Sequence, residues 1–233
     1  MAQDPYVYPG TTTLRNRYGV RDPAELARRE TAASTVRLAE LAARPIPGTY
    51  DLSHLQAFHH RIFGDVYEWA GEIRTVAIAK DDLFALPEHI ASYLGGMLAQ
   101  LGAEQHLRGL HREPFIDRLT HYLAEINATH PFREGNGRTQ RAFVQQLAQD
   151  AGHHIDWRAL DPQRNIDASR AAHRGDNQPL RAMLAELITA PEQDEITGLR
   201  SAAFPRPPRP TTPARSEQPS RPAPRRPGRA PKR

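Results

Sequence analysis

Residues 130–141 read His-Pro-Phe-Arg-Glu-Gly-Asn-Gly-Arg-Thr-Gln-Arg. Two glycines flank Asn136, so the backbone there can adopt left-handed dihedral angles that other residues resist. An apolar-periodic segment follows at once, from Thr139 to Ala151, and predicts a helix. The glycine turn therefore lies at a helix N-terminus, where N–H groups and the helix dipole both favour an anion such as phosphate.

The charged side chains of this stretch suit the same chemistry. Arg138 and Arg141 are three residues apart, so they share one helix face, and each presents a planar guanidinium that fits phosphate oxygens. Glu134 supplies a carboxylate oxygen, the ligand type that Mg²⁺ prefers beside phosphates. His130 belongs to the residue type whose ordinary pKa lies near neutrality, as a general base requires. The stretch predicts phosphoryl or nucleotidyl transfer; the competing interpretation is a tight turn before a surface helix with two solvated arginines.

This run resembles the signature of the Fic family, His-x-Phe-x-(Asp/Glu)-Gly-Asn-Gly-Arg-x-x-Arg, at every defined position. The resemblance covers residues 6–190 in outline, but only residues 130–141 are specific. It implies a mostly α-helical Fic-type bundle with a small β-hairpin flap. It also implies a protein adenylyltransferase, which moves AMP from ATP to a Ser, Thr or Tyr hydroxyl of a target protein and releases pyrophosphate.

The same resemblance implies a role for each motif position, with ATP as co-substrate and Mg²⁺ as cofactor. His130 is the catalytic base for the target hydroxyl, and Glu134 holds Mg²⁺ across the α- and β-phosphates. Phe132 is a structural anchor in the core. The residues that bind the ATP phosphates are Gly135, Asn136, Gly137, Arg138 and Arg141.

Capping residues and apolar periodicity predict the remaining helices, over residues 22–44, 51–63, 88–108, 114–129, 165–173 and 179–188. Alternation over residues 73–79 predicts a short strand that returns over 83–86 as a hairpin. In the Fic family a hairpin at this place is the flap that registers the target segment, a recognition mode based on an exposed strand edge. The resemblance therefore assigns target registration to Ile78, Ala79, Lys80 and Asp81. A plain surface hairpin is the alternative.

The absence of cysteine from the 233 residues excludes a disulfide framework and thiolate metal sites, and it fits a reducing compartment such as the cytoplasm. No apolar run is long enough to span a membrane, and residues 1–8 lack a signal-peptide pattern. Three histidines, at 54, 59 and 60, have no carboxylate or cysteine at ligand spacing, so we expect them in the core or at the surface rather than at a metal.

Composition divides the chain into an N-terminal arm packed on the body over 1–20, a Fic domain over 21–195 and a tail over 196–233. Residues 201–233 hold ten prolines and nine Lys or Arg against one Glu. Since the whole chain has a net charge of +4, residues 1–200 carry about four net negative charges. The tail cannot bury a core and is predicted to be disordered. Positive tails direct some relatives to type IV secretion systems; a solvated extension with no specific role is the alternative.

Two other functions stay open at this level. The basic tail could make the chain a nucleic-acid- or acidic-surface-binding protein, but the body is acidic and no predicted helix shows a Lys/Arg face interleaved with aromatic residues. A Fic enzyme could also use a different nucleotide. The complete Gly-Asn-Gly-Arg loop favours AMP transfer, because the kinase-type branch of the family lacks it.

Many Fic proteins restrain themselves with a helix that reads (Ser/Thr)-x-x-x-Glu-(Gly/Asn), whose Glu pairs with the second motif arginine, here Arg141. No Ser or Thr of this chain is followed by Glu four residues later. The resemblance therefore implies a toxin-like branch in which a separate antitoxin-like protein supplies the glutamate. We expect that partner to dock on an exposed first helix around residues 31–40. Topoisomerases are among the targets of that branch, and nothing in this sequence selects a target.

Overall fold

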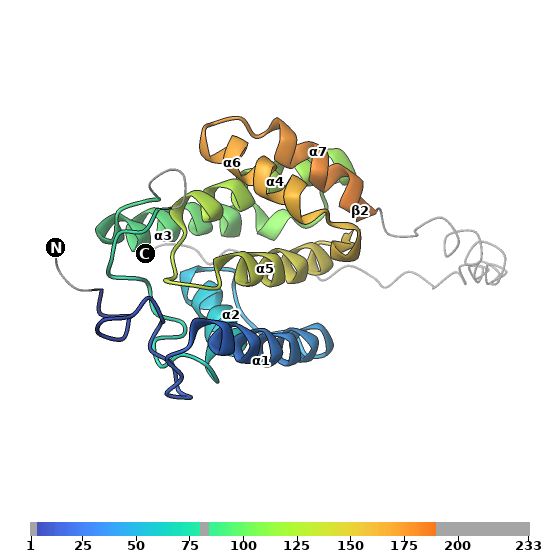
Figure 1. Ribbon diagram of the computed structural model, residues 1–233. Coiled ribbons are helices and arrows are strands. Elements are labelled where there is room, and N and C mark those ends of the chain that lie inside the picture. The colour runs from blue at the N-terminus through green and yellow to red at the C-terminus, as the bar shows by residue number, and fades with distance from the viewer. Residues whose placement is uncertain (1–3, 80–83, 190–233) are drawn as a thin grey trace, which may run out of the picture. The chain divides into compact units, whose positions relative to one another are not determined.

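The computed structural model describes residues 4–79 and 84–189 (Figure 1). The helices are α1 (Pro23–Ala43), α2 (Leu52–Phe63), α3 (Pro87–Ala103), η1 (Gln105–Leu107), α4 (Arg112–Thr129), α5 (Asn136–Asp150), η2 (Trp157–Ala159), α6 (Pro162–His173) and α7 (Gln178–Leu187). Two short strands, β1 (His154–Ile155) and β2 (Ile188–Thr189), pair antiparallel, with His154 opposite Thr189. The predicted mostly helical fold with a small sheet is confirmed.

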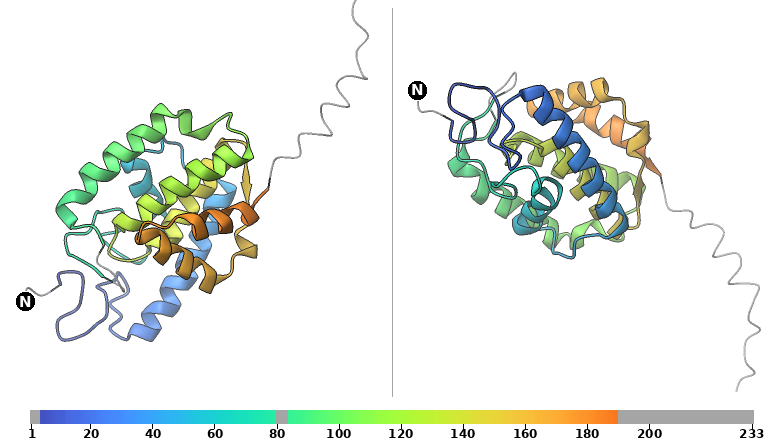
Figure 2. Two further views of the ribbon diagram at one scale, coloured as in Figure 1. Left: turned by 90° about the horizontal axis from the view of Figure 1, so that it is seen from above. Right: turned by 60° about the horizontal axis from the view of Figure 1, so that its bottom comes forward.

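Helices α4 and α5 form the centre of the bundle. Helix α5 contacts α2 on one side and α4 on the other, and α4 also contacts α3, α6 and α7. Figure 1 shows α1 and α2 on one side of α5 and α4, α6 and α7 on the other. Figure 2 shows the bundle from two further directions, with α1 in front in its right-hand view. The apolar residues that recur at helical spacing along α4 are all buried: Phe115, Leu119, Tyr122, Leu123 and Ile126. A buried helix therefore leads directly into the motif.

Aspartate caps set the starts of three helices. Asp22, Asp51 and Asp161 each accept a hydrogen bond from the backbone N–H three residues further on, at the starts of α1, α2 and α6. The first two match the predicted starts. The predicted start at Asn165 is wrong, because the Asp161 carboxylate and the following proline begin α6 one turn earlier.

Helix α3 ends at Ala103, five residues before the predicted end. Residues 105–107 have φ angles of 54°, 56° and 62°, which lie in the left-handed region and cannot continue an α-helix. The chain turns there through η1 instead, and Leu107 is fully buried.

The small sheet is not the hairpin that the alternating pattern predicted. Residues 73–79 contain no strand beyond a single bridge residue at Ala79, so the strand prediction there is wrong. The segment is held by the buried side chain of Arg74, which bonds carbonyl groups where a strand would use a backbone ladder. One backbone bond, from Phe84 N to Ile78 O at 3.3 Å, joins the two sides of the predicted hairpin. Lys80 and Asp81 lie outside the described residues.

Residues 4–20 contact the body through their first side chains. Tyr6 is buried, meets Trp69 edge-on at 5.3 Å between ring centroids, and shares a hydrogen bond with Thr75. Asp4 forms an ion pair with Arg133 of the motif at 2.9 Å. The tail over 196–233 lies outside the described residues. Within the described ranges, no helix has both the length and the apolar character needed to cross a membrane.

Candidate active site

His130 caps the C-terminus of α4 with a left-handed backbone, φ 46° and ψ 63°. Its Nδ1 lies 3.1 Å from the carbonyl oxygen of Asn127, and its ring stacks on Phe84 with 3.9 Å between centroids. A carbonyl only accepts, so Nδ1 carries the proton and the lone pair lies on Nε2. The imidazole is thus held in a tautomer that lets Nε2 accept a proton.

A buried arginine fixes the backbone on which His130 is mounted. Arg74 is 1% exposed, and its Nε donates to the His130 carbonyl oxygen at 2.8 Å. Its terminal nitrogens donate to the carbonyls of Thr129 (3.1 Å), Val76 (2.7 Å) and Ala85 (2.5 Å). Burial lowers the pKa of Arg74. One side chain therefore joins the end of α4 to both sides of the predicted flap.

The first glycine of the turn, Gly135, is required by the backbone conformation and by a close neighbour. Gly135 has φ 78°, and a Cβ built on it would lie 2.3 Å from the ring of Phe63. The side chain of Asn136 closes the turn, since its Oδ1 accepts from Phe132 N at 2.9 Å and its Nδ2 donates to Phe132 O at 2.7 Å. Phe132 itself is 1% exposed in the core. The Asn136 side chain is thus held within the turn, and its backbone N–H remains available for a phosphate.

His59 of α2 supports the turn from the core side. Its ring stacks on Phe132 with 3.9 Å between centroids. Its Nδ1 accepts from the N–H of Gly71 at 2.7 Å, so Nε2 carries the proton and donates to the carbonyl oxygen of Glu134 at 3.0 Å. Burial lowers the pKa of His59 to about 4. The histidine is therefore neutral at pH 7 and fixes the motif backbone.

Helix α5 begins directly after Gly135 without a capping side chain. The Gly135 N–H is already used, because it donates to Glu134 Oε1 at 2.8 Å. The N–H groups of the first helical residues, beginning with Asn136 and Gly137, lie at the positive end of the helix dipole and can bind an anion. Of the three amides expected to bind phosphate, the structure places two at the open helix end.

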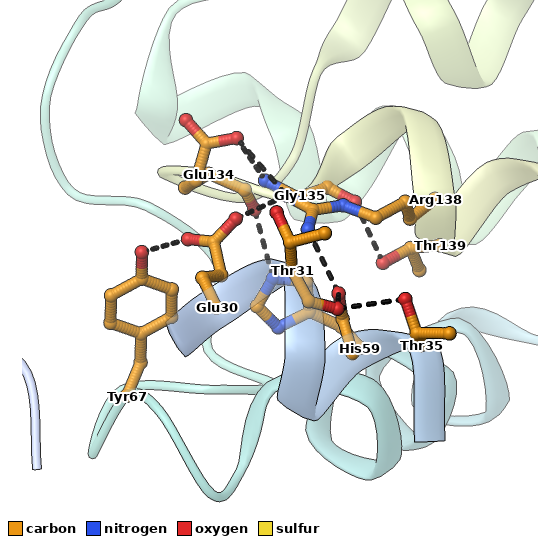
Figure 3. Close-up of polar contacts among 10 residues, drawn as sticks. Glu30, Thr31, Thr35, His59, Tyr67, Glu134, Gly135, Arg138 and Thr139 are labelled. Carbon is orange, nitrogen blue, oxygen red and sulfur yellow. Dashed lines mark hydrogen bonds and ion pairs between the residues drawn. The ribbon is translucent and has the colours of Figure 1, made fainter. Parts of the chain in front are cut away.

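The two motif arginines have different surroundings. Arg138 forms an ion pair with Glu30 of α1 (Figure 3). It also bonds the Ser34 hydroxyl at 3.0 Å and lies over the Phe63 ring, 4.7 Å from the ring centroid. Arg141 has no hydrogen-bond or ion-pair partner within residues 4–79 and 84–189. Burial, followed by the nearby charge of Arg138, lowers the pKa of Arg141. A bound anion would therefore stabilise the buried charge of Arg141.

Two cavities meet at Arg141. The first, of about 300 Å³, is lined by His130, Gly137 and Arg141. Its remaining walls include residues of η2 and α6, namely Trp157, Asn165, Ile166, Ser169, Arg170 and His173. The second, of about 570 Å³, lies between α1 and α5, and Arg138 and Arg141 both line it. The structure thus brings His130, the start of α5 and Arg141 to one cavity, while Arg138 lies toward α1.

Glu134 provides a carboxylate next to Arg138 at the start of α5. Its side chain is 46% exposed, and its Oε1 lies 3.7 Å from Arg138 Nη2. No group of three or more His, Cys, Asp or Glu that could hold a metal occurs in the described part of the chain. A single exposed carboxylate fits Mg²⁺, which is bound in such sites by one or two carboxylates together with phosphates and water.

Sequence analysis missed Glu30 and Arg74, and it expected His59 in the core or at the surface without its contact to the motif. Glu30 and Arg74 nevertheless leave a signal in the sequence. Glu30 and Ser34 occupy helical positions in line with the buried Leu26 and Leu41, so a polar pair interrupts an apolar stripe. Arg74 alternates in register with Val76, on the side of the segment that carries apolar residues. A polar residue at an apolar position indicates a buried partner.

The chain has close counterparts among known proteins. A profile of the Fic/DOC family matches residues 49–148. The chain is 44% identical over 189 residues to the protein adenylyltransferase VbhT of Bartonella schoenbuchensis, which covers 81% of this chain and 40% of VbhT. It is 42% identical over 188 residues to the probable protein adenylyltransferase y4lH of Sinorhizobium fredii, covering 80% of this chain and 96% of that relative.

Solved structures show the same fold. The BepC protein of Bartonella tribocorum, a VirB-translocated effector with bound AMPPNP, matches with a TM-score of 0.73 and 28% identity. That match covers 79% of this chain and 96% of the BepC chain. The chain thus spans less than half of VbhT but nearly all of y4lH and of the BepC structure.

Proposed function

Because the chain belongs to the Fic family, we propose that it is a protein adenylyltransferase that transfers AMP from ATP to a hydroxyl side chain of a target protein. One relative named for this activity, y4lH, is matched over 96% of the length of y4lH. The observation that carries the proposal is the shared cavity of His130, Gly137 and Arg141, which places a base beside an anion site.

In the proposed reaction, His130 Nε2 takes the proton of a Ser, Thr or Tyr hydroxyl as its oxygen attacks the α-phosphorus of ATP. The bond from the α-phosphorus to the bridging oxygen breaks, and pyrophosphate leaves. The N–H groups at the start of α5, with Arg138 and Arg141, bind the phosphates and neutralise the charge that develops on the leaving group. Glu134 would hold Mg²⁺, which supplies further charge neutralisation.

The α6 side of the 300 Å³ cavity suits the nucleobase. Trp157 and His173 line it. Trp157 Nε1 and His173 Nδ1 are buried and have no hydrogen-bond partner among the described residues. Buried polar atoms without partners are costly, so both are suited to groups on a bound nucleotide. Asn165 and Ser169 of α6 add two further polar side chains on the same wall.

The proposal is tested with ATP that carries its label on either the α- or the γ-phosphate. The protein is incubated with a bacterial lysate and Mg²⁺, and proteins are separated under denaturing conditions. Label on a protein band from α-labelled ATP alone supports AMP transfer. Label from γ-labelled ATP would indicate a kinase, and displacement of the signal by another nucleotide would indicate a different nucleotide substrate. Salt-sensitive nucleic-acid binding without covalent label would favour the basic tail as the working part.

A separate antitoxin-like partner fits the second cavity. Apolar residues of α1, Leu38, Leu41 and Ala42, line it together with Arg138 and Arg141. An amphipathic helix with one glutamate can bury an apolar face there and pair with Arg141. The side of α1 that carries Glu30 and Ser34 packs inward, so docking uses the edge of this cavity rather than the whole of residues 31–40 as expected from sequence.

Growth experiments test this partner. Without the partner, the protein should slow bacterial growth, and the His130→Ala variant should not. Normal growth with the active protein expressed alone would contradict the need for an inhibitor. Action inside the producing cell and delivery through a type IV system are both compatible with this arrangement. The relation to VirB-translocated effectors supports the second route.

A further inference from the structure

Glu30 of α1 contacts the phosphate-binding motif from a distance of 108 residues in sequence. Its carboxylate accepts from Arg138 Nη2 and from the Tyr67 hydroxyl (Figure 3). Glu30 is 9% exposed, so its charge is largely removed from water. A buried carboxylate next to a cation that binds phosphate either holds that cation in place or competes with the phosphate for it.

The surroundings of Glu30 are rigid. Tyr67 is 1% exposed and stacks on Trp69 with 4.3 Å between ring centroids. Burial, with the charge of Glu30 as the next cause, raises the pKa of Tyr67, so its hydroxyl keeps the proton that it donates. Because Tyr67 cannot move without opening the core, Glu30 stays where it is.

Three contacts from α1 and α2 hold Arg138, in addition to Glu134 of the motif at 3.7 Å. Glu30 and Ser34 of α1 bind its two terminal nitrogens, and the Phe63 ring of α2 lies under the guanidinium. A guanidinium has five N–H donors, so these two contacts leave donors for phosphate oxygens. Separating the pair would leave a buried charge without compensation. In the proposed mechanism, phosphate would therefore be bound by an arginine that remains paired with Glu30.

We propose that Glu30 is a positioning residue that orients Arg138 toward the leaving pyrophosphate, with Tyr67 holding Glu30. The proposal rests on the phosphate-binding role of Arg138 described above. The negative charge of Glu30 has a second effect, because it would repel the polyphosphate of ATP bound by Arg138. Loss of the Glu30 charge should therefore lower kcat through the loss of Arg138 orientation, while loss of the repulsion leaves KM for ATP equal or lower.

The test measures initial rates of label transfer from α-labelled ATP to lysate protein at several ATP concentrations. Glu30→Gln keeps the shape and one neutral hydrogen-bond acceptor but removes the charge. We expect kcat to fall about tenfold while KM for ATP stays equal or decreases. Tyr67→Phe keeps the ion pair between Glu30 and Arg138, and it should lower kcat by less than Glu30→Gln does. Glu40→Gln is the matched control, since Glu40 is on the same helix but pairs with Arg37 and Arg61 at the surface.

A double-mutant cycle separates positioning from other effects. Arg138→Ala should reduce transfer, and adding Glu30→Gln to it should cause no further loss. An unchanged or higher kcat in Glu30→Gln would overturn the proposal, with the increase indicating that Glu30 competes with phosphate. If Arg138→Ala itself transfers AMP at the parental rate, the phosphate role of Arg138 fails, and the positioning role with it. Thermal unfolding of each variant shows whether it is folded; if Glu30→Gln is not, Tyr67→Phe decides.

Discussion

Arg74 Nε donates to the backbone carbonyl of His130 at 2.8 Å, so a buried cation fixes the residue that the proposed mechanism uses as base. Its acceptors in the described residues are backbone carbonyls at the end of α4 and on both sides of the predicted flap. A structural change at the flap can therefore reach His130 through one side chain.

Arg74→Lys should impair both stability and transfer. A lysine ammonium cannot reproduce the planar fork that reaches four carbonyls. We expect a loss of about 2–4 kcal/mol in the free energy of unfolding, because hydrogen bonds to a charged group each contribute about 1.5–3 kcal/mol and some survive. Denaturant unfolding measures the first effect and label transfer the second. Arg61→Lys, at an exposed ion pair, is the control. Equal stability of Arg74→Lys and the parent would show that the carbonyl contacts are not needed.

Gly135→Ala should destabilise the protein by more than the cost of placing an alanine at a positive φ angle. Its added Cβ would meet the Phe63 ring at 2.3 Å. Gly152→Ala is the matched control, since Gly152 has φ 87° and nothing within 4 Å of a Cβ. We expect Gly152→Ala to cost about 1 kcal/mol of stability, as an alanine in the left-handed region does. The Gly135→Ala cost should be larger and should fall when Phe63→Leu is added. Equal costs at the two glycines would contradict the steric account.

The stability of the fold should decrease below pH 6.5 because of His59. Its pKa is lowered from 6.5 to about 4 by burial, so the unfolded chain binds the extra proton first. The contribution, roughly 3 kcal/mol, is present above pH 6.5 and is lost as pH falls from there toward 4. His59→Gln, whose amide can still donate to the Glu134 carbonyl, should show a shallower decline of melting temperature over this range. Parallel pH curves for parent and variant would assign the acid sensitivity elsewhere.

The tail should be dispensable for chemistry. Its excess positive charge and its prolines predict a segment that buries no core. Deletion of residues 201–233 should leave in vitro AMP transfer at the parental rate, whereas an assay of export through a type IV system can respond. Loss of transfer on deletion would place the end of the catalytic domain further along the chain than residue 195.

The motif and its helices could be predicted from sequence because their signals are local. The α4 periodicity and the glycine turn depend on residues within a few positions of each other, and the structure puts them at the centre of the bundle. The resemblance to one family then supplied the chemistry. The Glu30–Arg138 pair could not be predicted in the same way, because 108 residues separate the two and no local pattern sets which helices pack together.

The predicted hairpin shows how local patterns can mislead. Residues 73–79 alternate in the manner of a strand, but alternation reports only which side chains face inward. In this case the inward residues include Arg74, whose guanidinium satisfies carbonyls that a neighbouring strand would otherwise bind. A charged residue at an inward position was the sign that side-chain bonds, rather than a backbone ladder, hold the segment.

The most direct measurement of the central claim compares the parent with His130→Ala in transfer from α-labelled ATP to lysate protein. His121→Ala is the control, since His121 is a partly exposed histidine of the same helix. We expect the transfer rate of His130→Ala to be about two to four orders of magnitude below that of the parent, the usual cost of losing a general base. Its melting temperature should stay near that of the parent. His121→Ala should transfer at the parental rate. Parental labelling by a folded His130→Ala protein would contradict the mechanism.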